Sequence, residues 1–105
     1  GAVRAAATRM LERRGHRVVE ARHGADALLV WAAQGATIDV VVTDVRMPEM
    51  GGPELVAALR AQGTPVPVVY VTGYADHSLA PEPGPRERVV PKPFDATTLC
   101  AAVEA

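Results

Sequence analysis

A layered α/β fold with a parallel sheet is predicted by two features of this 105-residue sequence. Short apolar segments of strand character alternate along the chain with longer segments in which apolar residues recur at the helical period. The composition, 49% apolar and 22% charged, is that of an ordinary globular domain. Strands that alternate with helices at this spacing are joined by right-handed crossovers, which make the strands parallel and place helices against the sheet.

The first half of the chain predicts two helices and two strands. A first helix is expected over residues 2–14, because Arg13, Arg14 and Gly15 form a cationic last turn followed by a glycine stop. A short strand over 17–21, a helix over 25–34 and a strand over 38–43 follow in order. The last of these contains the run Val40 to Val42, which is typical of a strand buried on both faces of a parallel sheet.

The second half continues the alternation. A third helix is expected from Pro53, a favourable first-turn residue, to the stop at Gly63, and a buried strand over 66–71 follows it. Any fourth helix, over 75–79, is short, because Pro81, Pro83 and Pro85 cannot stand inside a helix. A brief strand at Val89 and Val90 ends at Lys92, and Asp95 caps a last helix.

Charge and cysteine content exclude several function classes. The 11 basic and 12 acidic residues give a net charge of −1, which lacks the positive excess expected of a nucleic-acid-binding protein. Cys100 is the single cysteine, so no intramolecular disulfide or cysteine-rich zinc site is expected, and a reducing, cytoplasmic location fits best. The sequence has neither a membrane-length apolar run nor a leader pattern, so no direct membrane contact is expected.

Three reactive side chains follow three of the predicted strands: Asp44, Thr72 and Lys92. Taken alone, each is more often a turn residue, a structural hydroxyl or a solvated charge. The carboxyl ends of parallel strands meet at one edge of a sheet, so the three are expected to converge there. A carboxylate can accept a phosphoryl group covalently, while a hydroxyl and an ammonium stabilise its oxygens. Lys92 is the chain's only lysine beside ten arginines.

The segments around these residues resemble those of response-regulator receiver domains. Residues 39–52, Asp-Val-Val-Val-Thr-Asp-Val-Arg-Met-Pro-Glu-Met-Gly-Gly, are similar to the family's phosphoacceptor loop. Residues 71–75 resemble its switch segment after the fourth strand, and residues 91–94, Pro-Lys-Pro-Phe, its lysine signature. The turn at 21–27 is also similar, with His23 where Asp or Asn is more usual. The likeness covers essentially the whole chain.

The resemblance implies a fold and a function. The fold would be a flavodoxin-like, doubly wound parallel sheet of strand order 2-1-3-4-5, with residues 1–105 forming one receiver domain. Asp44 would accept a phosphoryl group from a phosphohistidine on a histidine kinase or histidine phosphotransfer domain, and Thr72 and Lys92 would contact the phosphate. Asp44 and the backbone carbonyl of Arg46 would be ligands of Mg²⁺. Arg46 and Tyr74 would tune the phosphate lifetime, and the Lys92–Pro93 peptide would be cis.

Three departures from the family pattern qualify these expectations. The family's first strand and the pair of acidic residues at its end are absent from this sequence, which begins within the first helix. Either residues upstream of Gly1 supply both in the intact protein, or the chain is a truncated receiver. In the second case the loss should open a gap in the sheet, leave backbone groups unpaired and deprive a magnesium ion of carboxylate ligands. Val89 stands where many receivers have an aromatic switch residue, and the proline cluster erodes the fourth helix.

Several alternatives remain open. The chain is expected to act in two-component signalling, either as a single-domain regulator or as the terminal receiver of a hybrid sensor kinase. The sequence does not predict its oligomeric state. It would catalyse its own phosphorylation and dephosphorylation if the acidic pair were present, and is not a conventional enzyme. A pseudo-receiver that serves only as an interaction module is the main rival. An aspartate-nucleophile phosphatase is disfavoured, because Arg46 stands where that class has a second Asp. Arginines 4, 9, 13 and 14 form either a solvated face or a docking face for a phosphotransfer helix.

Overall fold

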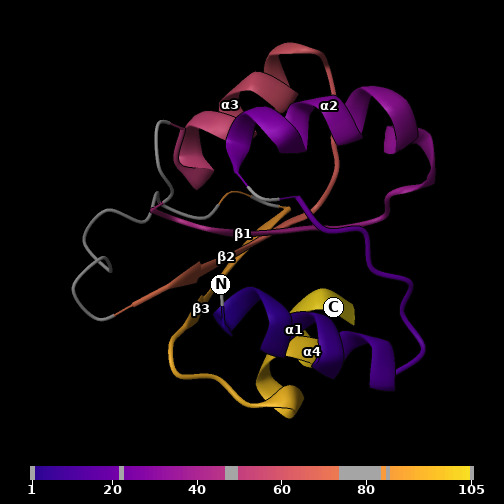
Figure 1. The fold of residues 1–105 in the computed structure, drawn as a ribbon. Helices are drawn as coiled ribbons and strands as arrows, with labels where there is room; N and C mark the ends of the chain where they lie inside the picture. The colour runs from indigo at the N-terminus through magenta and orange to yellow at the C-terminus, as the bar shows by residue number, and fades with distance from the viewer. Residues whose placement is uncertain (1, 22, 47–49, 74–83, 85, 105) are drawn as a thin grey trace.

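The computed structural model describes residues 2–21, 23–46, 50–73, 84 and 86–104. It has three layers, with α2 and α3 on one face of a central sheet and α1 and α4 on the other (Figure 1). The elements are α1 (Ala2–Arg13), α2 (Gly24–Gln34), the 3₁₀ turn η1 (Gly35–Thr37), β1 (Val41–Asp44), α3 (Gly52–Ala61), β2 (Val68–Thr72), β3 (Glu87–Pro91) and α4 (Ala96–Glu104). The predicted α/β class is confirmed.

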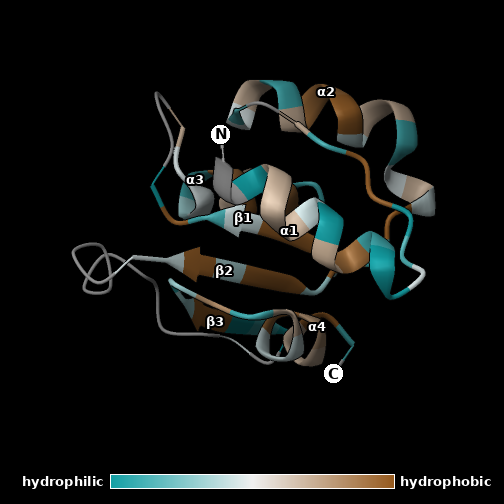
Figure 2. Ribbon diagram, turned by 60° about the horizontal axis from the view of Figure 1, so that its bottom comes forward, coloured by the Kyte–Doolittle hydropathy of each residue, from teal (hydrophilic) through white to brown (hydrophobic). Residues whose placement is uncertain are grey.

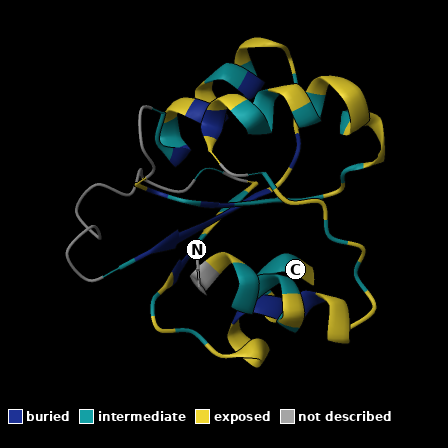
Figure 3. Ribbon diagram, in the orientation of Figure 1, coloured by how far each residue is buried: buried dark blue, intermediate teal, exposed yellow. Residues whose placement is uncertain are grey.

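The sheet has three parallel strands in the order β1-β2-β3. In the register, Asp44 lies opposite Val71, and Thr72 lies opposite Pro91. All five residues of β2 are buried, as expected for a central strand covered by helices on both faces (Figure 3). Hydrophobic residues accordingly run along β2 between the two helical layers (Figure 2).

The predicted strand over 17–21 is wrong. These residues belong to no strand; they run as an irregular connection from α1 to α2 (Figure 1). Alternation and β-branched residues favour extended structure, but a strand also needs a hydrogen-bonding neighbour. In the order expected from the family, that neighbour is the strand missing from this sequence. The strand predicted over 38–43 begins later, at Val41, and ends at Asp44; residues 38–40 connect it to η1 without regular structure.

The helix boundaries follow local signals. His23 caps α2, where its Nδ1 accepts a hydrogen bond from the Asp26 amide at 3.1 Å. Asp95 caps α4, as predicted, by accepting a hydrogen bond from the Thr98 amide at 2.8 Å, and this bond lowers the pKa of the Asp95 carboxyl. Gly15 and Gly63 have φ of 89° and 78°, the left-handed conformation that glycine adopts readily. The expected fourth helix, at 75–79, lies outside the described residues.

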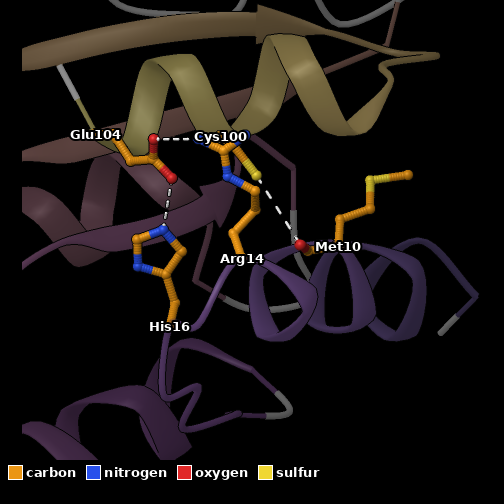
Figure 4. Close-up of polar contacts among 5 residues, drawn as sticks. All are labelled: Met10, Arg14, His16, Cys100 and Glu104. Atoms are coloured by element: carbon orange, nitrogen blue, oxygen red, sulfur yellow. Dashed lines mark hydrogen bonds and ion pairs between the residues drawn. The ribbon is translucent and has the colours of Figure 1, made fainter.

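Helices α1 and α4 pack together beneath the sheet. Leu11, Leu99 and Cys100 are buried between them. Polar contacts close the edge of this interface (Figure 4). Glu104 Oε1 accepts a hydrogen bond from Arg14 Nη2 at 2.8 Å, and Glu104 Oε2 lies 2.8 Å from His16 Nε2. The hydrogen bonds to His16 and Arg14 lower the pKa of the Glu104 carboxyl. None of the helices that the structure describes has the length and apolar character needed to cross a bilayer.

Candidate functional site

The three predicted site residues lie at the carboxyl edge of the sheet. Asp44 is the last residue of β1, Thr72 is the last residue of β2, and Lys92 directly follows β3. The Lys92 amide donates to the Thr72 carbonyl at 2.8 Å, which continues the ladder between β2 and β3 to this edge. Parallel pairing in register therefore brings together residues that are far apart in the sequence.

An ion pair joins the two charged members of this group. Lys92 Nζ lies 2.6 Å from Asp44 Oδ1, with side-chain exposures of 30% and 35%. Oδ1 is itself buried and makes no hydrogen bond within the described residues, so the ammonium is its one charged contact there. Since removing water from a carboxylate is costly unless a cation compensates, Lys92 fixes where this oxygen lies.

Thr72 is placed differently from the other two. Its side chain is buried, with 1% of the residue exposed, and its Oγ1 donates to the Gly73 carbonyl at 3.2 Å. The hydroxyl is therefore bonded to the backbone of the next residue rather than to Asp44. The structure brings Asp44 and Lys92 into direct contact and holds Thr72 on the adjacent strand end.

A glycine that the sequence analysis did not assign to the site holds the end of β1 in place. The Gly52 amide donates to the Val45 carbonyl at 2.9 Å, and Gly52 is buried. A Cβ at this position would clash with the carbonyl oxygen of Asp44 and lie 3.2 Å from Thr43 Cγ2. The start of α3 thus packs directly on the backbone of Asp44. Gly52 ends the 39–52 segment that resembles the phosphoacceptor loop, but the sequence analysis gave this residue no role of its own.

The residues expected to bind magnesium form an incomplete set. Mg²⁺ requires about six oxygen ligands in octahedral geometry, and proteins usually contribute one or two carboxylates. Here the assigned donors are the Asp44 carboxylate, already paired with Lys92, and the backbone carbonyl of Arg46. Within the described ranges, no group of three or more His, Cys, Asp or Glu side chains is placed to hold a metal ion. These two donors alone do not fit a magnesium site.

Two further family expectations have different outcomes. The Lys92–Pro93 peptide is cis, as predicted. Tyr74, expected to tune the phosphate lifetime, lies outside the described residues. Val89, which replaces the usual aromatic residue, is partly buried and packs against the core cluster that contains Val68 and Tyr70.

Comparison with known proteins gives one consistent family. The family model described as "Response regulator receiver domain" matches residues 1–104. The sensor kinase CckA of Brucella abortus is 37% identical over 105 residues, which is 98% of this chain and 11% of that protein. The transcriptional regulatory protein FixJ of Azorhizobium caulinodans is 36% identical, over 99% of this chain and 49% of that protein. The chain thus spans less than half the length of either relative.

Solved structures agree with this result. The crystal structure of the receiver domain from hybrid histidine kinase CckA superposes with a TM-score of 0.80 at 33% identity, covering 98% of this chain and 87% of that one. A response regulator receiver protein from Sinorhizobium medicae gives a TM-score of 0.84 at 28% identity, covering 99% and 84%. The flavodoxin-like doubly wound architecture is therefore confirmed.

Proposed function

Because this chain belongs to the response regulator receiver domain family, we propose that it is a phosphorylation-dependent switch in which Asp44 accepts a phosphoryl group from a phosphohistidine. The observation that supports this proposal is the 2.6 Å contact between Lys92 Nζ and Asp44 Oδ1 at the carboxyl edge of the sheet. The Asp44 carboxylate provides a nucleophile. The Lys92 ammonium and the hydroxyl of Thr72, at the end of the middle strand β2, provide two groups that stabilise phosphoryl oxygens.

The transfer follows from these groups. Since Oδ1 is buried against Lys92, Oδ2 of Asp44 is the oxygen that attacks phosphorus. The new P–O bond forms as the P–N bond to the donor histidine breaks, and the released imidazole keeps the bonding pair and takes a proton. Lys92 then balances charge on the phosphoryl oxygens. The Thr72 hydroxyl would exchange the Gly73 carbonyl for a phosphoryl oxygen, which couples phosphorylation to the end of β2.

Partners and cofactor follow from the family. Receiver domains act with histidine kinases or phosphotransfer proteins, and they generally use Mg²⁺ at the phosphorylation site. For this chain we propose a histidine kinase or phosphotransfer domain as donor, a cytoplasmic location and a single receiver domain over residues 1–105, either alone or at the end of a hybrid kinase. Asp44 and the Arg46 carbonyl would contribute to a magnesium site that needs further oxygen ligands.

A pseudo-receiver is the second candidate, and a specific observation favours it. The magnesium donor set is incomplete, and the Thr72 hydroxyl is turned to Gly73 rather than to Asp44. A domain of this kind would keep the fold and bind partners without accepting phosphate.

Phosphorylation with acetyl phosphate and Mg²⁺, followed by intact mass measurement, distinguishes the two. The proposal predicts one added phosphoryl group on the wild-type chain, none on Asp44→Asn, and an undiminished gain on Asp39→Asn, an exposed carboxylate that precedes β1. The deciding measurement is made on the chain joined to an upstream strand that ends in two acidic residues, because the magnesium site needs those further oxygen ligands. Absence of any added phosphate on that protein, shown to be folded by circular dichroism, would leave the interaction module as the function.

A further inference from the structure

The first turn of α2 is capped by a histidine, where most helices have Asn, Asp, Ser or Thr. His23 has an extended backbone, with φ of −162° and ψ of 176°. Its Nδ1 accepts a hydrogen bond from the Asp26 amide at 3.1 Å, and its carbonyl accepts one from the Ala27 amide at 2.9 Å. His23 is exposed, so the ring is in equilibrium with protons of the solvent.

The cap requires a neutral ring. A backbone amide can only donate, so Nδ1 must offer its lone pair and the ring proton must be on Nε2. A protonated imidazole donates from both nitrogens and accepts at neither. Its positive charge would also face the positive end of the helix dipole. The cap is therefore present at high pH and is lost as the pH falls through the range in which histidines gain a proton.

The capped turn packs on the segment between β1 and α3. Gly24, the first residue of α2, is buried, and a Cβ built on it would lie 2.7–2.8 Å from the Cβ, Cγ and Sδ atoms of Met50. The Met50 side chain thus lies directly on the Gly24 backbone. Met50 also packs against the buried cluster that contains Leu55. Loosening the first turn of α2 would therefore remove a neighbour of Met50, two residues before the start of α3 at Gly52.

We propose that His23 makes the start of α2 sensitive to pH: protonation of its ring releases the first helical turn and loosens the packing of that turn on Met50. This regulation goes beyond phosphoryl acceptance and does not depend on it, because the cap and the turn respond to protons alone. An asparagine at the same position would cap the helix without this response, since its side-chain oxygen accepts a hydrogen bond throughout this pH range.

Other charged residues surround the cavity that His23 borders, and several of them form ion pairs. These pairs join Arg4 to Glu20, Lys92 to Asp44, and His16 to Glu104. The cavity is also lined by Arg17, Asp39 and Arg46, and Asp26 lies on α2 itself. A His23→Asn protein keeps all of these groups, so any pH response of theirs appears in it and in the wild type alike. The difference between the two proteins isolates the His23 ring.

Nuclear magnetic resonance and urea denaturation test the proposal. As the pH is lowered from 8 to 5, the signals of the His23 ring, the Asp26 amide and the Met50 methyl group should change together in one transition. Over the same range, the folding equilibrium constant should fall about fivefold more in the wild type than in His23→Asn, which corresponds to the loss of one cap. His23→Ala, which has no side-chain cap at any pH, should show at pH 8 the Met50 signal that the wild type shows at pH 5.

Three results would overturn the proposal. The first is an equal pH dependence of folding in the wild type and in His23→Asn. The second is an Asp26 amide and a Met50 methyl group whose signals stay constant while the His23 ring gains its proton. The third is a His23→Ala protein whose Met50 signal changes between pH 8 and pH 5 as much as in the wild type, because another group would then be responsible.

Discussion

Replacing Gly52 by alanine should destabilise the protein through the end of β1, which carries Asp44. The new Cβ would meet the Asp44 carbonyl oxygen closer than the 3.0 Å that real Cβ atoms keep, and would lie 3.1 Å from the Asp44 carbonyl carbon and 3.2 Å from Thr43 Cγ2. The clash is with backbone, which cannot rotate away as a side chain does. Either α3 or the end of β1 must therefore move. We expect the free energy of unfolding to fall by about 1–3 kcal/mol, the usual cost of overpacking.

Urea denaturation followed by circular dichroism measures this loss. Gly84→Ala is the matched control, because its Cβ would meet only ordinary contacts, 3.6 Å from Glu87, and should change stability by less than about 0.5 kcal/mol. If Asp44 moves by on the order of 1 Å, phosphate acceptance should also slow by up to about 100-fold. A Gly52→Ala protein as stable as Gly84→Ala would refute the account of the strand end.

Three other predictions concern the packing around the site. Leu99→Ala should cost about 3–5 kcal/mol in urea denaturation, because Leu99 is fully buried between α1 and α4; a loss below about 1 kcal/mol would contradict this. Burial raises the pKa of Tyr70 to about 12, so the phenol absorbance of a Tyr74→Phe protein, in which Tyr70 is the remaining tyrosine, should not titrate near pH 10. The phenol of the unfolded chain ionises at a lower pH than that of the folded chain. The free energy of unfolding should therefore fall as the pH rises from 10 through 12. Arg60 donates to the Thr64 and Val66 carbonyls through Nη1, at 2.9 and 2.7 Å, and pairs with Glu87 through Nη2 at 3.2 Å. Arg60→Lys should therefore lower the free energy of unfolding by about 1–3 kcal/mol. An unchanged midpoint of urea denaturation would show that the guanidinium group is not needed for stability.

The strand ends could be predicted from the sequence because their signals are local. Continuous apolar residues in β1 and β2 indicate that both faces of each strand are buried. The polar residues that follow indicate where each strand stops. Parallel topology then implies that Asp44 and Lys92 meet, which the structure confirms at 2.6 Å. Asp95 was predicted as a cap by the same local reasoning, and its hydrogen bond to Thr98 confirms it.

The errors arise where structure depends on a distant partner. Residues 17–21 have a strand-like pattern but no neighbour to pair with, so the pattern alone gave the wrong prediction. The bond of the Thr72 hydroxyl to the Gly73 carbonyl depends on side-chain rotation, which the spacing of residues along the sequence does not determine. The contact of Gly52 with Asp44 depends on how closely α3 approaches the strand, which no local signal measures.

The presence of one lysine among eleven basic residues has a practical consequence. Amine-directed acylation can modify only two groups on this chain, the terminal amine and the ε-amine of Lys92. Acetyl phosphate is itself an acyl donor, so prolonged incubation would convert that cation to a neutral amide and free the Asp44 oxygen that it pairs with. A preparation tagged through its lysine would consequently carry the label next to Asp44 and would report on a protein that had lost this ion pair.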